Sequence, residues 1–293
     1  MINYNSKEWL LGIFMFKKGD TLRQLFPAII GVCIYTAGIV YAERSLLHLP
    51  DSSPVRNFGI LQTLLSFVIS MLLVFRTNTA YDRWWEGRKH WGALVNNCRN
   101  LAVKINAMLP HHDERNRSFY RRLIPAFCHA LRLHLQSETT RLALDTDPHP
   151  EIPDFDHTRH VPNQIAGLMI GKANMLYRDG VITGDQLITL NNELQSFLDI
   201  CGACERIKNT PIPYSYSVFI KKFIFIYTAT LPIGLVYSLN YLLVPVVALV
   251  FYVLASLEMI AEEIEDPFGT DPNDLPMEKI SDNISRNVHD ILR

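Results

Sequence analysis

The chain has 293 residues, of which 48% are hydrophobic and 19% charged, and its formal net charge is −1. The charged share lies below the roughly 25% typical of soluble proteins, which favours a membrane protein. The sequence has no basic excess to indicate nucleic acid as a partner, and its five irregularly spaced cysteines predict no disulfide framework.

The first two membrane helices are predicted by two stretches without charged side chains, residues 24–42 and 57–75. At a rise of 1.5 Å per residue, each stretch is about 28 Å long, just enough to cross a hydrocarbon core. The alternative is a soluble protein with long buried helices, but such helices are usually shorter and amphipathic.

The third uncharged stretch, residues 223–257, predicts two further membrane helices. A single helix of that length would measure about 52 Å, which is too long for one crossing. Residues 238–241 are the natural break, so we expect antiparallel helices over about 215–238 and 242–264. The first membrane helices and this pair together make four crossings.

The basic residues predict the orientation of these helices. They gather before the first helix, after the second and before the third: Lys17, Lys18, Arg23, Arg76, Arg83, Arg88, Lys89, Lys208, Lys221 and Lys222. The connection between the first two helices has a balanced charge, and the connection between the last two has none. Both termini and the middle segment are therefore expected on the cytoplasmic side.

The polar middle segment, residues 76–214, is expected to be a cytosolic helical region. Its predicted helices cover 84–108, 117–135, 164–178 and 183–207, with a loop over 145–163. Pro125 should kink or break the second of them, and Gly184 and Asp185 fit the start of the last.

The predicted fold class is all-α, with a membrane bundle continuous with the cytosolic helices. Residues 1–75 hold an amphipathic N-terminus and the first two membrane helices, residues 215–264 hold the last two, and residues 265–293 form a cytosolic C-terminal segment.

No catalytic motif supports an enzyme. The chain lacks a phosphate-binding loop, a nucleophile elbow and a His-Glu-x-x-His pair. Cys201 and Cys204 form a Cys-x-x-Cys inside a helical pattern, without the second pair of a zinc site. His111-His112, His129 and His134 are interpreted as surface or packing residues, with a transient metal site as the alternative.

Three motifs together resemble the bestrophin family. The first is the run over residues 76–88, with its Arg83-Trp84-Trp85 element, after the second membrane helix. The second covers residues 210–216 before the third helix, and the last covers residues 265–274, with its Pro267-Phe268-Gly269 segment, after the fourth. Their order and spacing fit the family over about residues 20–285, and the chain is similar to the short bacterial branch.

The resemblance implies a homopentameric ion channel in the bacterial inner membrane, with one central pore lined by the second helix. Family members of animals conduct anions, and the bacterial branch includes a cation conductor. The family's narrow neck, counted back from Arg83, maps onto Phe67, Met71 and Phe75. Residues four apart share a helix face, so these side chains would form three apolar rings over about 12 Å.

A competing stripe on the same helix is polar and consists of Gln62, Ser66 and Ser70. Periodicity alone would turn it toward a pore, whereas close packing on a neighbouring helix is the alternative that the family register favours. Thr63 lies on the apolar stripe and is expected at the outer pore.

Two further sites follow from the resemblance. A cytosolic aperture is assigned to Ile182, with Val181 as the second candidate. Asp271 and Asp274 are candidate calcium ligands, because hard cations prefer carboxylate oxygens. Pro272 and Asn273 interrupt the acidic run, which favours a solvated acidic helix end instead. No other cofactor is expected.

The expected partners are further copies of the chain, the lipid bilayer and small permeant ions. The acidic end of the fourth helix could concentrate cations. Together with the resemblance to the bacterial branch, this favours monovalent cations, with chloride close behind. A non-conducting membrane scaffold is the alternative function. A carrier is less well supported, because no internal repeat is visible.

Overall fold

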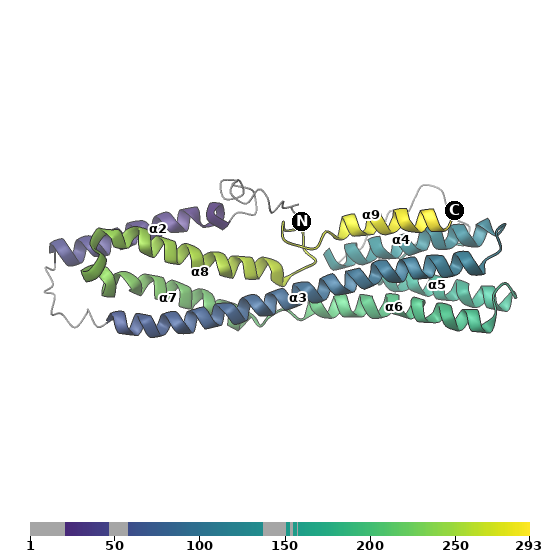
Figure 1. Ribbon diagram of the computed structural model, residues 1–293, viewed down its shortest axis with the longest axis horizontal. Helices are drawn as coiled ribbons and strands as arrows, with labels where there is room; N and C mark the ends of the chain where they lie inside the picture. Colours follow the sequence, from purple (N-terminus) through teal and green to yellow (C-terminus); the bar gives the residue numbers. More distant parts are fainter. Residues whose placement is uncertain (1–20, 47–57, 137–150, 153–154, 157) are drawn as a thin grey trace. The chain divides into compact units, whose positions relative to one another are not determined.

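The computed structural model describes residues 21–46, 58–136, 151–152, 155–156 and 158–293, and every regular element in these ranges is helical (Figure 1). In chain order the elements are α2 (Thr21–Tyr41), η2 (Ala42–Leu46), α3 (Phe58–Met108), α4 (Glu114–Gln136), α5 (Val161–Arg178), α6 (Gly184–Asn209), α7 (Tyr214–Leu239), η4 (Asn240–Leu242), α8 (Leu243–Glu265) and α9 (Met277–Ile291). The all-α prediction is confirmed.

One compact unit comprises the chain up to Arg83 together with Pro211–Asp266 and Asp271–Asn273. In it, α2 packs on α7 and α8, and α7 packs on α8. Ile69 and Leu73 of α3 join the apolar core that these helices share. The short turn η4 connects α7 to α8, and there Asn240 adopts a left-handed backbone conformation with φ of 54°. We call this part the membrane unit.

The membrane unit exposes large apolar side chains to its surroundings, including Phe26 and Ile34 of α2, Phe225 of α7 and Leu249 of α8. Water-soluble bundles rarely expose such extensive apolar faces. Three helical stretches are long and apolar enough to cross a membrane: Thr21–Ser45, Gly59–Met108 and Tyr214–Glu265. The last of them contains both α7 and α8, so four helices serve as membrane spans, as the sequence predicts.

The second compact unit comprises Trp84–Thr210, Pro267–Thr270 and Asp274–Arg293. Here α4 packs on α5 and α9, and α5 packs on α6, around a core in which Phe127 and Phe197 meet edge to face with ring centroids 4.8 Å apart. Thr183 caps α6 through a capping box with Gln186. We call this part the helical unit.

The structure changes several details of the sequence predictions. The helix expected to end near residue 75 and the one expected over 84–108 are a single element, α3. Pro125 does not break α4, which continues to Gln136. The side chains around Pro125 are buried on several sides of α4, and this tertiary packing offsets the backbone hydrogen bond that proline removes. The amphipathic N-terminus lies before the first described residue, and residues 145–150, 153–154 and 157 of the predicted 145–163 loop also lie outside the described residues.

Candidate functional site

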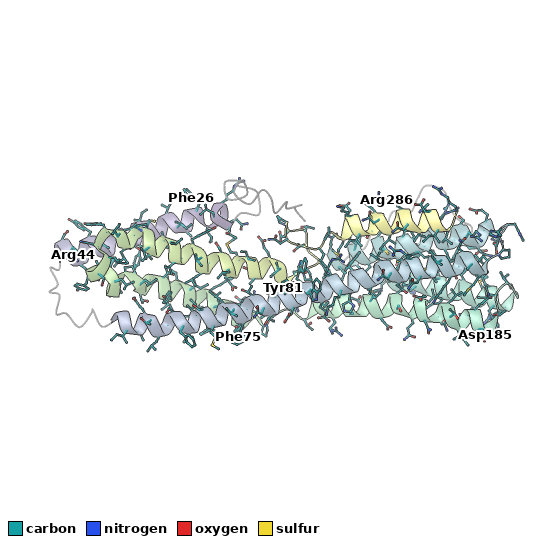
Figure 2. All side chains as sticks on the ribbon, in the orientation of Figure 1. Phe26, Arg44, Phe75, Tyr81, Asp185 and Arg286 are labelled. Carbon is teal, nitrogen blue, oxygen red and sulfur yellow. The ribbon has the colours of Figure 1, made fainter. Side chains whose placement is uncertain are left out.

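The predicted neck residues lie on a face of α3 that no other part of the described membrane unit covers. Phe67, Met71 and Phe75 are 68%, 49% and 56% exposed, and Phe75 is labelled on α3 in Figure 2. Leu64 and Val74 are exposed on the same face. We call this surface the free face of α3, and Thr63, the predicted outer-pore residue, is exposed at its edge.

The opposite face of α3 is packed against the rest of the membrane unit. Gln62, Ile69 and Leu73 are buried there, and at about 100° per residue they are centred roughly 180° around the helix from the three neck residues. A helix packed on one side only has a fixed rotation about its axis. The direction in which the free face points is therefore set by contacts within a single subunit.

The polar stripe that competed for the pore contacts a neighbouring helix through Gln62, which donates from Nε2 to the carbonyl oxygen of Thr230 in α7 at 2.5 Å. Ser66 and Ser70 donate to carbonyl oxygens of α3 itself, those of Thr63 and Ser66, each at 2.7 Å, and Ser70 is exposed. The buried amide of Gln62 thus favours packing at that end of the stripe.

The predicted aperture residue lies in a different environment. Ile182 is 4% exposed and belongs to the core of the helical unit, whereas a residue that narrows a lumen must present its side chain to it. Val181 next to it is half-buried. The burial does not favour Ile182 in this role, and the aperture stays a prediction in which Val181 is the better exposed candidate.

The two predicted calcium ligands differ in exposure. Asp271 is exposed and Asp274 is buried, and they fall in different compact units. Neither belongs to a group of three or more clustered metal-ligand residues in the described part of the chain. Calcium binding at these residues therefore stays a prediction.

A buried ion network was not predicted from the sequence, because no charged residue was recognised inside a membrane span. Arg76 of α3 lies one residue past the uncharged stretch, and its guanidinium is 2.7 Å from a Glu265 carboxylate oxygen and 3.6 Å from Glu258, both of α8. Glu265 also accepts the backbone N–H of Ile212 at 2.7 Å. The signal was a pair of acids in the last two turns of an apolar helix, Glu258 and Glu265, together with an arginine at the end of another uncharged stretch.

The network continues through the Arg-Trp-Trp element. Arg83 donates from Nε to the carbonyl oxygen of Glu265 at 3.0 Å, so two arginines two turns apart on α3 hold the end of α8. In the helical unit, Gly87 lies against the Pro267-Phe268 pair, and a Cβ atom there would come within 3.2 Å of both side chains. The two sequence motifs are thus brought into direct contact.

Comparison with known proteins identifies relatives over nearly the whole chain. The family model described as bacterial and fungal bestrophin protein matches residues 1–290. A voltage-dependent anion channel-forming protein of Nostoc is 34% identical over 97% of this chain and 92% of its own. The corresponding protein YneE of Escherichia coli is 30% identical over 96% of this chain and 90% of its own.

Solved structures agree with these relatives. A mutant of a bacterial bestrophin homolog from Klebsiella pneumoniae superposes with a TM-score of 0.81 at 25% sequence identity, covering 92% of this chain and 98% of that one. A second mutant of the same homolog gives a TM-score of 0.80 at 25% identity, with coverages of 92% and 100%.

Proposed function

Because the chain belongs to the bacterial and fungal bestrophin family, we propose that it is an ion channel rather than an enzyme, with a pore lined by the free face of α3. The observation that carries the proposal is the exposure of Phe67, Met71 and Phe75 on the side of α3 opposite its packed face. Family membership and the names of the relatives support the channel activity.

The channel is proposed to be a homopentamer in the bacterial inner membrane, with both termini in the cytoplasm. Rotational symmetry brings the same face of one helix from every subunit to a common axis. The free face of α3 meets that requirement, because it is apolar and is not covered by the described helices of its own subunit. The basic residues that flank the membrane helices support the orientation.

The neck is proposed to gate by dewetting. Phe67, Met71 and Phe75 from several subunits would form three rings spaced by about 6 Å along the axis. A narrow apolar passage expels water, and with it ions, when its diameter shrinks slightly. The flexible thioether of Met71 suits the middle ring, since it can adapt to small changes of diameter. Thr63 would line the wider outer part.

The permeant ion is proposed to be small and monovalent. Some observations favour a cation and others favour an anion. The lean toward cations rests partly on the acids at the end of α8. However, Glu258 and Glu265 pair with Arg76, and Glu262 pairs with Lys221 at 2.8 Å. These partners reduce the unbalanced negative charge there, and the relatives are named for anions. The reversal potential in a salt gradient decides between the two signs.

The neck is tested by single-channel recording of purified protein in planar bilayers. We expect Phe67→Ala and Met71→Ala to raise the conductance or the open probability, because each removes the bulk of one ring. Ile34→Ala is the matched control, since Ile34 is 69% exposed but lies on α2. Equal currents in all variants would remove the neck assignment, and a complete lack of current in the wild type would favour a non-conducting scaffold.

A further inference from the structure

Two histidines and a glutamate from three elements meet in the helical unit. His134 lies in the last turn of α4, His160 is the N-cap of α5 and Glu205 belongs to α6. Nε2 of His134 is 2.6 Å from Oε1 of Glu205, and Nε2 of His160 is 2.5 Å from the same oxygen. The imidazole centroids are 4.3 Å apart, so all three functional groups converge on one point.

We propose that His134, His160 and Glu205 bind a transition-metal dication of the zinc type. Two imidazoles and one carboxylate are a donor set that zinc prefers, and three protein ligands leave a fourth position for water. The three donor atoms already lie within 4.8 Å of one another. A tetrahedral ion with bonds of about 2.0–2.1 Å needs donor atoms about 3.3 Å apart, so small side-chain rotations are sufficient.

The cluster is also accessible to an ion from solution. The side chains of His134, His160 and Glu205 are 24%, 28% and 31% exposed. They are therefore packed well enough to keep their geometry but remain open on one side. An ion bound there would connect α4, the start of α5 and α6, and so would stabilise the helical unit.

Zinc binding breaks a hydrogen bond that His160 makes in the absence of metal. Nδ1 of His160 accepts the backbone N–H of Asn163 at 3.1 Å, so the neutral ring carries its proton on Nε2. Coordination through Nε2 moves that proton to Nδ1, which can then no longer accept. Zinc must therefore release the cap of α5, a single hydrogen bond that is small beside a metal–imidazole bond. Binding is expected to speed amide hydrogen exchange at Asn163 while it slows exchange elsewhere in α4 and α6.

The test uses the purified full chain, stripped with a chelator and titrated with zinc against a chromophoric competitor. We expect one ion per subunit, a tetrahedral visible spectrum when cobalt replaces zinc, and a higher unfolding temperature with zinc than without. His134→Gln, His160→Asn and Glu205→Gln should each weaken zinc affinity by about tenfold or more.

Two features of the design separate loss of a ligand from loss of folding. Asn is a favoured N-cap residue, so His160→Asn keeps the cap and should unfold at the wild-type temperature without metal. The double variant His111→Asn/His112→Asn is the control, because this adjacent and exposed pair offers zinc an alternative surface site. Failure of the wild type to bind zinc, or zinc affinity that is unchanged in all three cluster variants, would overturn the proposal.

Discussion

Arg76 shows at the residue scale how the membrane unit accommodates charge. Its guanidinium is buried, and so is the carboxylate of Glu258. Removing one member of such a network leaves an uncompensated charge in an apolar environment, which costs far more than the loss of an exposed ion pair. The network also fixes the end of α8 to the helix that carries the neck residues, through Arg76 and Glu265.

Arg76→Gln is expected to destabilise the protein by about 3–5 kcal/mol, because Glu258 and Glu265 would lose their shared cation. Lys221→Gln is the matched control. It removes an exposed pair with Glu262 and should cost no more than about 1 kcal/mol. Thermal unfolding in detergent compares the two variants, and equal midpoints would contradict a stabilising role for the buried network.

Gly87 is a second residue at which side-chain size matters. In a helix interior, alanine is normally favoured over glycine by about 1 kcal/mol. At Gly87, however, a Cβ atom would come within 3.2 Å of Phe268 and Pro267, and the fully buried Phe268 ring has little room to move. The short side chain therefore permits the close approach of the Pro-Phe-Gly segment to α3.

Gly87→Ala is expected to destabilise the protein. Overpacking costs about 1–3 kcal/mol of stability, which exceeds the gain in helix propensity. Gly171→Ala in α5 provides the control, since its Cβ would meet open space and stability should rise by up to about 1 kcal/mol. Unfolding midpoints measured side by side test the difference in sign. A stabilised Gly87→Ala variant would show that the motif contact is loose.

At the scale of elements, the sequence predicted most helices, because uncharged stretches and apolar periodicity report directly on burial. The break between α7 and α8 was predicted within a few residues. The membrane bundle was predicted to be continuous with the cytosolic helices, but residues 76–83 were not assigned to a helix, because the composition changes there from apolar to charged; in the structure α3 runs through them. Helix α9 was missed as well, although Ile280, Ile284 and Val288 follow a four-residue period.

The same limits apply to the candidate site. The neck stripe came from the register implied by the resemblance, and helical spacing alone would have chosen Gln62, Ser66 and Ser70. Contacts between residues far apart in sequence, such as that of Gln62 with Thr230, favour the apolar stripe, and the spacing does not reveal them. The cluster around Glu205 could not be predicted for the same reason, because its members come from three separate elements.

Packing of α9 on α4 is expected to matter for the whole helical unit. Ile284→Ala should destabilise the protein by about 2–5 kcal/mol, since it leaves a cavity beneath a buried face. Arg286→Ala, on the exposed side of the same helix (Figure 2), should change stability by less than about 0.5 kcal/mol. Chemical or thermal unfolding distinguishes them, and similar losses would indicate that α9 contributes through its surface.

At the scale of the whole molecule, the exposed apolar surface of the membrane unit has two different surroundings. Side chains such as Ile34 and Leu249 can face lipid, which solvates apolar groups as well as protein does. The free face of α3 is different in the proposed channel, because it borders the pore and depends on neighbouring subunits to enclose it. In the proposed channel, the function therefore belongs to the assembly and not to one chain.

Native mass spectrometry of the detergent-solubilised protein is expected to give five times the subunit mass of 33.6 kDa. The pentamer should persist in Phe67→Ala, because in the proposed channel the neck residues would face the axis rather than a neighbouring subunit. Blue native electrophoresis provides an independent check of both proteins. A monomer or dimer as the sole species would contradict a shared pore.

The turn at η4 has a consequence for biosynthesis. The connection between α7 and α8 is a three-residue 3-10 helix, reversed by the left-handed Asn240, and residues 223–257 carry no charge. Almost no polar chain has to be translocated when this pair enters the bilayer. The two helices can therefore insert together as one hairpin straight from the ribosome, with their backbone hydrogen bonds already satisfied within each helix.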